Sequence, residues 1–321
     1  MGYPRRVYVS PDAPGIYHCV SRCVRRAFLC GEDPLTGRSF EHRKRWIETR
    51  ILELGSIFSV AVHAYAVMSN HVHVVLEIDP RVAMAWPDKD VARRWLSLFH
   101  GGQDAAGASL EARAEALASH RERIATLRQR LGDLSWFMRC LNEPVARRAN
   151  REDGCSGRFW EGRFKCQALL DDAAVLACMV YVDLNPVRAG VVSTPEMALH
   201  TSLRRRCDVD ALAGPLAPVA SSIAGAALSL TTANYLELVD WTGRALHSDK
   251  RGAIADHVPG ILTRMTLRPK QWLCQVPATE SAYWRAIGCA ESLIRHAEKL
   301  GRCWLCGVGF AKRLESFSET T

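Results

Sequence analysis

The sequence lacks two features that would direct it to a membrane. No apolar run approaches the length of a membrane-spanning helix, and the N-terminus has no apolar core after its first charges, as a secretion signal would. These absences predict a cytoplasmic protein without a membrane partner. A regular alternation of strands and helices is also missing, which argues against a doubly wound parallel sheet.

A second Cys-x-x-Cys pair is absent as well. Cys303 and Cys306 form a lone pair of this kind, and a zinc site needs four ligands, so we interpret the pair as fortuitous. The twelve cysteines are scattered through a chain of 321 residues for which we expect no secretion signal. This pattern predicts reduced thiols, most of them packed as small apolar side chains.

Acidic residues are outnumbered by basic ones. The chain carries 42 Lys and Arg against 34 Asp and Glu, for a formal net charge of +8. Such an excess suits a polyanionic partner without requiring one. The composition is otherwise that of a globular protein, at 48% hydrophobic and 24% charged residues, and the length allows one large domain or two moderate ones.

One predicted strand carries two histidines on the same face. Residues 70–78 are mostly branched and apolar, and Asp79-Pro80 ends them. Because side chains alternate along a strand, His71 and His73 point the same way. Two imidazoles a few ångströms apart can hold a divalent cation in common. The alternative is a pair of half-exposed histidines on a sheet.

The order of the elements predicts an α+β fold. The expected strands cover residues 15–24, 57–68, 71–78 and 158–170. The expected helices cover residues 40–54, 90–100, 134–150 and 173–184. The second and third strands are separated by a short turn, so we expect them to form an antiparallel hairpin.

Two further stretches interrupt this order. Residues 101–133 open with two glycines and continue rich in Ala, Glu and Arg, with apolar residues near helical spacing. This predicts an inserted helix, with a local hairpin or a partner-binding arm as alternatives. Residues 211–228 are rich in Ala, Pro and Ser, which predicts a linker, with a loosely packed loop as the alternative. It would join a domain of residues 1–210 to a mostly helical extension of residues 229–321, to which we assign no role.

The predicted helix at 173–184 brings two polar side chains to one face. Residues 171–172, both aspartate, are suited to cap its start, and Pro186 is expected to end it. Tyr181 and Asn185 are four residues apart and therefore share a face. Each has an ordinary alternative, since a helical Tyr is usually a packing residue and an Asn before Pro commonly stops a helix.

Basic and aromatic residues alternate in the predicted strand at 158–170, which contains Arg158, Arg163 and Lys165 among Phe159, Trp160 and Phe164. This pattern suits single-stranded or hairpin nucleic acid, where cations meet phosphates and rings stack on bases. The alternative is a half-buried strand with a solvated charged face. Further candidates for phosphate contacts, each with the alternative of a solvated surface residue, are Arg25, Arg26, Arg147, Arg148 and Arg188.

Three motifs occur in a fixed order, at residues 68–73 (Met-Ser-Asn-His-Val-His), 157–164 (Gly-Arg-Phe-Trp-Glu-Gly-Arg-Phe) and 181–190 (Tyr-Val-Asp-Leu-Asn-Pro-Val-Arg-Ala-Gly). Together they resemble the single-tyrosine HUH transposases, and among them the REP-associated tyrosine transposases, relatives of the insertion-sequence 200-like transposases of bacteria. The resemblance covers residues 8–205. It implies a bacterial protein with the ferredoxin-like HUH endonuclease fold, in which an antiparallel sheet carries the histidines and a packed helix presents the tyrosine.

The resemblance also implies roles for individual residues. His71 and His73 would hold Mg²⁺ or Mn²⁺ with Asn185 as third ligand, and Tyr181 would be the nucleophile. The implied activity is a DNA strand transferase that cleaves and rejoins single-stranded, hairpin-containing DNA through a 5′-phosphotyrosine. It implies no nucleotide cofactor and allows a homodimer.

Two other hypotheses remain open at the level of the sequence. The first is a non-catalytic nucleic-acid-binding protein that keeps the fold. The second is a metal-dependent phosphodiesterase with water as nucleophile. A free phenol has a pKa of about 10, so a tyrosine nucleophile needs activation, and the sequence singles out no general base.

Overall fold

The computed structural model describes residues 9–10, 12–24, 30–33, 37–99, 109–208, 216–217, 230–246, 268–279 and 285–316. Within them, one sheet contains β1 (Gly15–Arg22), β2 (Val60–Val67), β3 (His71–Ile78), β4 (Lys165–Leu169) and β5 (Ala286–Ile287). The strand order is β2-β3-β1-β4-β5. The first four strands pair antiparallel, and β5 adds to β4 in parallel.

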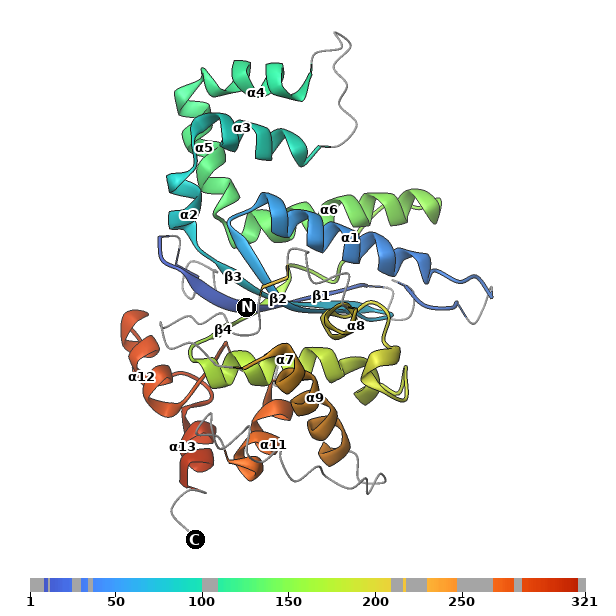
Figure 1. The fold of residues 1–321 in the computed structure, drawn as a ribbon, viewed down its shortest axis with the longest axis vertical. Helices are drawn as coiled ribbons and strands as arrows, with labels where there is room; N and C mark the ends of the chain where they lie inside the picture. The colour runs from blue at the N-terminus through green and yellow to red at the C-terminus, as the bar shows by residue number, and fades with distance from the viewer. Residues whose placement is uncertain are drawn as a thin grey trace.

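Helices cover both faces of this sheet (Figure 1). α1 (His42–Ile57) and α6 (Leu134–Glu152) lie on one face, and α7 (Asp172–Arg188) lies on the other. The order β4-β1-β3-β2 with α1 and α6 on a common face is that of a ferredoxin-like βαββαβ unit. The predicted α+β fold with an antiparallel central sheet is therefore confirmed.

The two faces of the sheet have separate cores. Val72, Val74 and Leu76 of β3 pack with the α1 and α6 side chains. Val75 of the same strand packs with α7 on the opposite face. This alternation follows from the period of two in a β-strand, and it leaves His71 and His73 on the α7 face.

The remaining helices continue both layers. Beyond α1 and α6 lie α2 (Pro80–Ala85), α3 (Asp88–Ser97), α4 (Leu110–Ala118) and α5 (Arg121–Leu131). On the α7 side lie η2 (Pro195–Met197), α8 (Ser202–Cys207), α9 (Thr232–Leu246), α11 (Pro269–Ala278), α12 (Ala290–Lys299) and α13 (Val308–Ser316). None of the described helices is both long and apolar enough to cross a lipid bilayer.

The structure corrects the prediction of one inserted helix. Residues 109–131 form two helices, α4 and α5, separated at Ser119 and His120. The Ser109 side chain caps the first helix, and Ala114 faces the core from it. The second helix buries Leu127 in the same core, so this stretch is the hairpin that the apolar spacing also allowed.

Two element boundaries differ from the prediction. The expected strand at 158–170 is regular only over β4, because residues 161–163 bend. Trp160 instead makes an isolated bridge to Cys23. Helix α7 does not end at Pro186 but continues to Arg188. The left-handed residue just beyond it is Gly190, with φ of 67°, the position that glycine favours after a helix.

The C-terminal segment is tied directly to α7. Asp171 accepts a hydrogen bond from the Ala174 amide at 2.9 Å, as a helix cap, and another from the Cys289 amide at 2.6 Å. A Cβ on Gly288 would lie 2.8 Å from the Asp171 carboxylate, so this close approach requires glycine. α9 and α11 pack on α7 as well. The division into residues 1–210 and 229–321 stays a prediction.

Most of the predicted linker lies outside the described residues. Ala217 is described, and its amide donates to the Val62 carbonyl at 2.8 Å, beside the edge strand β2. The thiols follow the expected pattern in part. All twelve cysteines are present as thiols, and five of them, including Cys303 and Cys306, are exposed.

Candidate active site

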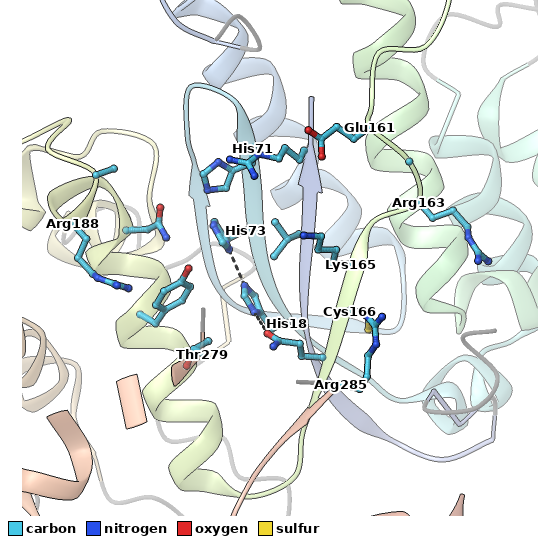
Figure 2. Close-up of a pocket in the computed structure, with 17 residues that line it drawn as sticks. His18, His71, His73, Glu161, Arg163, Lys165, Cys166, Arg188, Thr279 and Arg285 are labelled. Atoms are coloured by element: carbon cyan, nitrogen blue, oxygen red, sulfur yellow. Dashed lines mark hydrogen bonds between the residues drawn. The ribbon is translucent and has the colours of Figure 1, made fainter. Parts of the chain in front are cut away.

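Three histidines meet on the α7 face of the sheet (Figure 2). β1 and β3 are paired so that Val20 lies opposite His73 and Arg22 opposite His71. His18, two residues before Val20, points to the same face and reaches His73. The alternation within β3 supplies two of the rings, and the register between the strands supplies the third.

The rings of His18 and His73 form a hydrogen-bonded chain with Gln167 of β4. His18 Nδ1 lies 2.9 Å from Gln167 Oε1, and His18 Nε2 lies 2.9 Å from His73 Nδ1. The two rings are stacked, with centroids 5.1 Å apart. His73 Nε2 is buried and has no hydrogen-bond partner among the described residues. A buried polar atom without a partner destabilises the fold unless a ligand or an ion binds to it.

Burial keeps the three rings neutral near pH 7. Desolvation lowers the pKa of His18 from 6.5 to about 4. Desolvation, followed by the positive charge of Arg22, lowers the pKa of His71 to about 4 as well. The pKa of His73 is lowered well below 6.5, mainly by desolvation. A neutral imidazole has one nitrogen lone pair in the ring plane, and that lone pair is what a metal requires.

Helix α7 presents Tyr181 and Asn185 to these histidines. The Tyr181 ring stands edge-on to His73, with centroids 5.7 Å apart. Asn185, one turn later, lies near the His71 ring and acts to raise the pKa of His71, against the larger lowering by burial. Arg188 places its guanidinium carbon 5.2 Å from the Tyr181 ring centroid. These three residues share a helix face because their spacings are four and three residues.

The four candidate residues line one cavity of about 550 Å³. Its described lining includes the cationic residues Arg22, Arg163, Lys165, Arg188 and Arg285. Glu161 is the one carboxylate among the described lining residues. Tyr181 is 4% exposed and lies in its wall. A concave site with several cations and a buried phenol suits a phosphate-containing ligand.

Other predicted residues lie elsewhere. Arg147 and Arg148 are on α6, across the sheet from α7, where Arg147 pairs with Glu143 and Arg148 stacks 3.6 Å from the Trp46 ring centroid. Arg158 is exposed and is not among the lining residues. Arg25 and Arg26 lie outside the described residues. DNA contacts by these five arginines stay predictions.

The aromatics near β4 are committed to packing. Phe159 is buried in the core on the α6 side of the sheet, and Phe164 packs against that core. Trp160 donates from Nε1 to the Asn142 carbonyl at 2.9 Å. The structure thus favours the half-buried alternative for these rings over platforms for stacked bases.

The lining residues that the sequence reasoning missed include His18, Arg22, Gln167, Thr279 and Arg285. The alternation of residues 15–24 could have placed the first two on one face, but the choice of face depends on strand pairing. Thr279 follows α11, and its buried hydroxyl has no described partner. Nothing in the local sequence marks Thr279 or Arg285 as lining a cavity formed by residues far away in the chain.

The ligand atoms available at the site suit a divalent cation. No group of three His, Cys, Asp or Glu side chains in the described part of the chain is arranged to hold a metal, which also leaves Cys303 and Cys306 without such a group. The candidate set is instead two imidazoles and an amide, from His71, His73 and Asn185. The Nε2 of His73 supports the fit, since it is a buried nitrogen without a described hydrogen-bond partner on a ring that lines the same cavity as His71 and Asn185.

Known proteins give no match at the level of the sequence and a partial similarity at the level of the structure. No protein-family model and no curated protein matches the chain. Among solved structures, a REP-associated tyrosine transposase bound to a REP hairpin is similar over 70% of this chain and 97% of that chain, with a TM-score of 0.38 and 15% sequence identity.

Proposed function

We propose that this protein is a metal-dependent DNA strand transferase that cleaves and rejoins single-stranded, hairpin-containing DNA through Tyr181. The observation that carries the proposal is the meeting of Tyr181 and Asn185 from α7 with His71 and His73 from β3 in one cavity. Four residues singled out by two separate sequence motifs would have no reason to converge if each were only a packing residue.

The chemistry follows from the nucleophile. The Tyr181 oxygen attacks a DNA phosphorus, a P–O bond forms, and the bond from phosphorus to the 3′ oxygen of the preceding nucleotide breaks. The Tyr181 hydroxyl loses its proton, and the leaving 3′ oxygen takes one up, so the products are a 5′-phosphotyrosine and a 3′-hydroxyl. Phenolate is a better leaving group than an alkoxide, so a DNA 3′-hydroxyl can reverse the step and rejoin the strand without a nucleotide cofactor.

The chain's own cations would position the phosphate. Arg22 and Lys165 line the cavity next to the histidines, and Arg188 lies over the Tyr181 ring. Their charge stabilises both the bound phosphate and the developing phenolate. His71, His73 and Asn185 would hold Mg²⁺ or Mn²⁺, and the chemistry supplied by that ion when bound is polarisation of the scissile phosphate.

The test is formation of a covalent protein–DNA adduct. Labelled single-stranded hairpin DNA is incubated with protein and Mn²⁺, and the products are separated by denaturing electrophoresis. We expect an adduct with the unmodified protein, none with Tyr181→Phe, and unchanged hairpin binding by that variant. Tyr65→Phe is the matched control, because Tyr65 is buried and hydrogen-bonded to Glu48 outside the cavity.

The alternative functions give different products. An adduct formed by Tyr181→Phe would refute the assignment of the nucleophile. Cleavage by Tyr181→Phe without an adduct would indicate water as nucleophile. Hairpin binding that is indifferent to EDTA, with no cleavage by the unmodified protein, would indicate a non-catalytic nucleic-acid-binding protein.

A further inference from the structure

The hydrogen-bonded chain behind His73 has a defined direction. Gln167 Oε1 is a carbonyl oxygen and can only accept, so the proton between it and His18 belongs to His18 Nδ1. A neutral His18 then has its lone pair on Nε2, 2.9 Å from His73 Nδ1. The proton of this second contact must therefore sit on His73 Nδ1. The lone pair of His73 is left on Nε2, the atom without a described partner.

The same tautomer is favoured at His71 by a different group. His71 Nδ1 contacts the Asn70 side-chain carbonyl oxygen, which again can only accept. Both histidines thus hold their protons on Nδ1, which leaves the lone pair of each ring on Nε2. Two separate contacts, one with the adjacent asparagine and one through a relay of two residues, thus favour the same tautomer at the two histidines.

We propose that Gln167 and His18 are positioning residues that hold His73 in the Nδ1–H tautomer and so make its Nε2 a ligand for a divalent cation. The inference deepens the proposed function, because it rests on the cation site of His71, His73 and Asn185. Neither Gln167 nor His18 would touch the cation. Their effect passes entirely through the hydrogen bond to His73 Nδ1.

Burial supports a positioning role over an incidental contact. His18 is 2% exposed, His73 4% and Gln167 9%. Neighbouring positions on this face of the sheet hold Ile16 and Val75, so an apolar side chain fits the layer. Burying imidazoles and an amide there costs free energy unless each is satisfied. The relay satisfies both nitrogens of His18 and one nitrogen of His73, and leaves one lone pair for use.

The opposite arrangement would silence the site. If the amide nitrogen of Gln167 faced His18, that nitrogen would donate, His18 would carry its proton on Nε2, and His73 would carry its own on Nε2 as well. A protonated Nε2 cannot bind a cation. The identity of the Gln167 atom facing His18 therefore decides whether His73 is a ligand.

The first test is the tautomer itself, in metal-free protein labelled with ¹⁵N-histidine. Long-range ¹H–¹⁵N correlation spectra distinguish Nδ1–H from Nε2–H. We expect His18 and His73 to be Nδ1–H in the unmodified protein, and the Gln167→Leu variant to lose this preference at both rings. An Nε2–H tautomer at His73 in the unmodified protein would overturn the proposal.

The second test is Mn²⁺ affinity, measured by the electron paramagnetic resonance signal of the free ion. Removing a hydrogen-bond partner behind a ligating histidine typically weakens metal binding about 10–100-fold, so we expect a loss in that range for Gln167→Leu. Gln167→Glu keeps an acceptor and should bind Mn²⁺ at least as tightly as the unmodified protein. Equal affinity of Gln167→Leu and the unmodified protein would overturn the proposal.

A buried histidine elsewhere provides the matched control. His63 is 1% exposed and contacts Glu77 at 3.2 Å, away from the cavity. His63→Gln should leave Mn²⁺ affinity unchanged, and thermal melting of all variants identifies any that misfold. A loss of affinity in His63→Gln equal to that in a folded Gln167→Leu would assign both effects to general destabilisation and overturn the relay.

Failure here is distinguishable from failure of the proposed function. If the relay variants behave as expected but Tyr181 forms no adduct, the strand-transfer proposal falls and the positioning role stands. If the adduct forms but Gln167→Leu binds Mn²⁺ normally, the positioning role falls alone. If the unmodified protein binds no Mn²⁺, the role of the relay at a cation site is overturned whatever the tautomers are.

Discussion

A buried carboxylate on the tyrosine helix offers the sharpest test of how the C-terminal segment supports the site. Asp183 lies between Tyr181 and Asn185 in sequence and is fully buried. Its Oδ1 accepts from the Ser202 hydroxyl at 2.6 Å and the Leu203 amide at 3.0 Å. Its Oδ2 accepts from the Tyr235 hydroxyl on α9 at 2.6 Å. We predict that Tyr235→Phe destabilises the whole fold.

The magnitude follows from what the substitution leaves behind. Phenylalanine keeps the packing of the Tyr235 ring but removes the hydrogen bond that Oδ2 of Asp183 accepts from the Tyr235 hydroxyl. Leaving a buried, charged acceptor without one of its hydrogen bonds lowers the free energy of unfolding by about 2 kcal/mol. Burial raises the pKa of Asp183, and the hydrogen bonds to its carboxylate only partly offset this effect. Losing one of them therefore leaves the buried charge less stable. For a chain of this size the loss corresponds to a melting temperature lower by about 4 °C.

The assay is urea or thermal unfolding, with Tyr65→Phe as control. The Tyr65 hydroxyl also bonds a carboxylate, Glu48, at 2.6 Å. However, Glu48 is 18% exposed and its other oxygen pairs with His200, so water and His200 can compensate. We expect a loss of about 1 kcal/mol there. A Tyr235→Phe variant no less stable than Tyr65→Phe would refute the reasoning.

Two further predictions concern the cavity. Arg285→Ala should weaken hairpin DNA binding and lower the salt dependence of binding by about one ion, because it removes one cation from the cavity. Arg139→Ala on α6, across the sheet, should do neither, and equal effects of the two variants would place the DNA elsewhere. Metal-free protein should lose about 3 kcal/mol of stability from His18 as the pH falls from 6.5 to 4, because its folded pKa of about 4 lies below the unfolded value and the unfolded chain binds the proton first. Urea unfolding of unmodified protein and His18→Gln across this range checks it, and parallel pH profiles would contradict it.

The candidate residues that could be predicted are those whose placement depends on local periodicity. His71 and His73 share a face because strands repeat every two residues, and Tyr181 and Asn185 share one because helices repeat every 3.6. Pro186 shows where local rules end. It was expected to stop α7, yet it is buried within the last turn and the helix continues to Arg188. Packing of this turn outweighs the missing amide.

The residues that could not be predicted depend on non-local pairing. His18 reaches His73 only because β1 and β3 adopt one register, which nothing within residues 15–24 specifies. β5 has two residues, too few for any alternation to be recognised. Arg285, which directly precedes β5, therefore could not be placed beside the cavity from the sequence, and the extension expected to be mostly helical contains a strand of the central sheet.

Because β5 pairs with β4, a segment near the C-terminus completes a cavity whose other residues are synthesised earlier. Chains emerge N-terminus first at about 5–20 residues per second, so Arg285 follows Arg188 after roughly 5–20 s. During that interval a nascent chain can contain Tyr181 and both strand histidines with one wall of the cavity not yet synthesised. Arg285 is the last to be added of the five cations among the described lining residues, and a chain released before it would carry Tyr181, His71 and His73 in a cavity that lacks this wall.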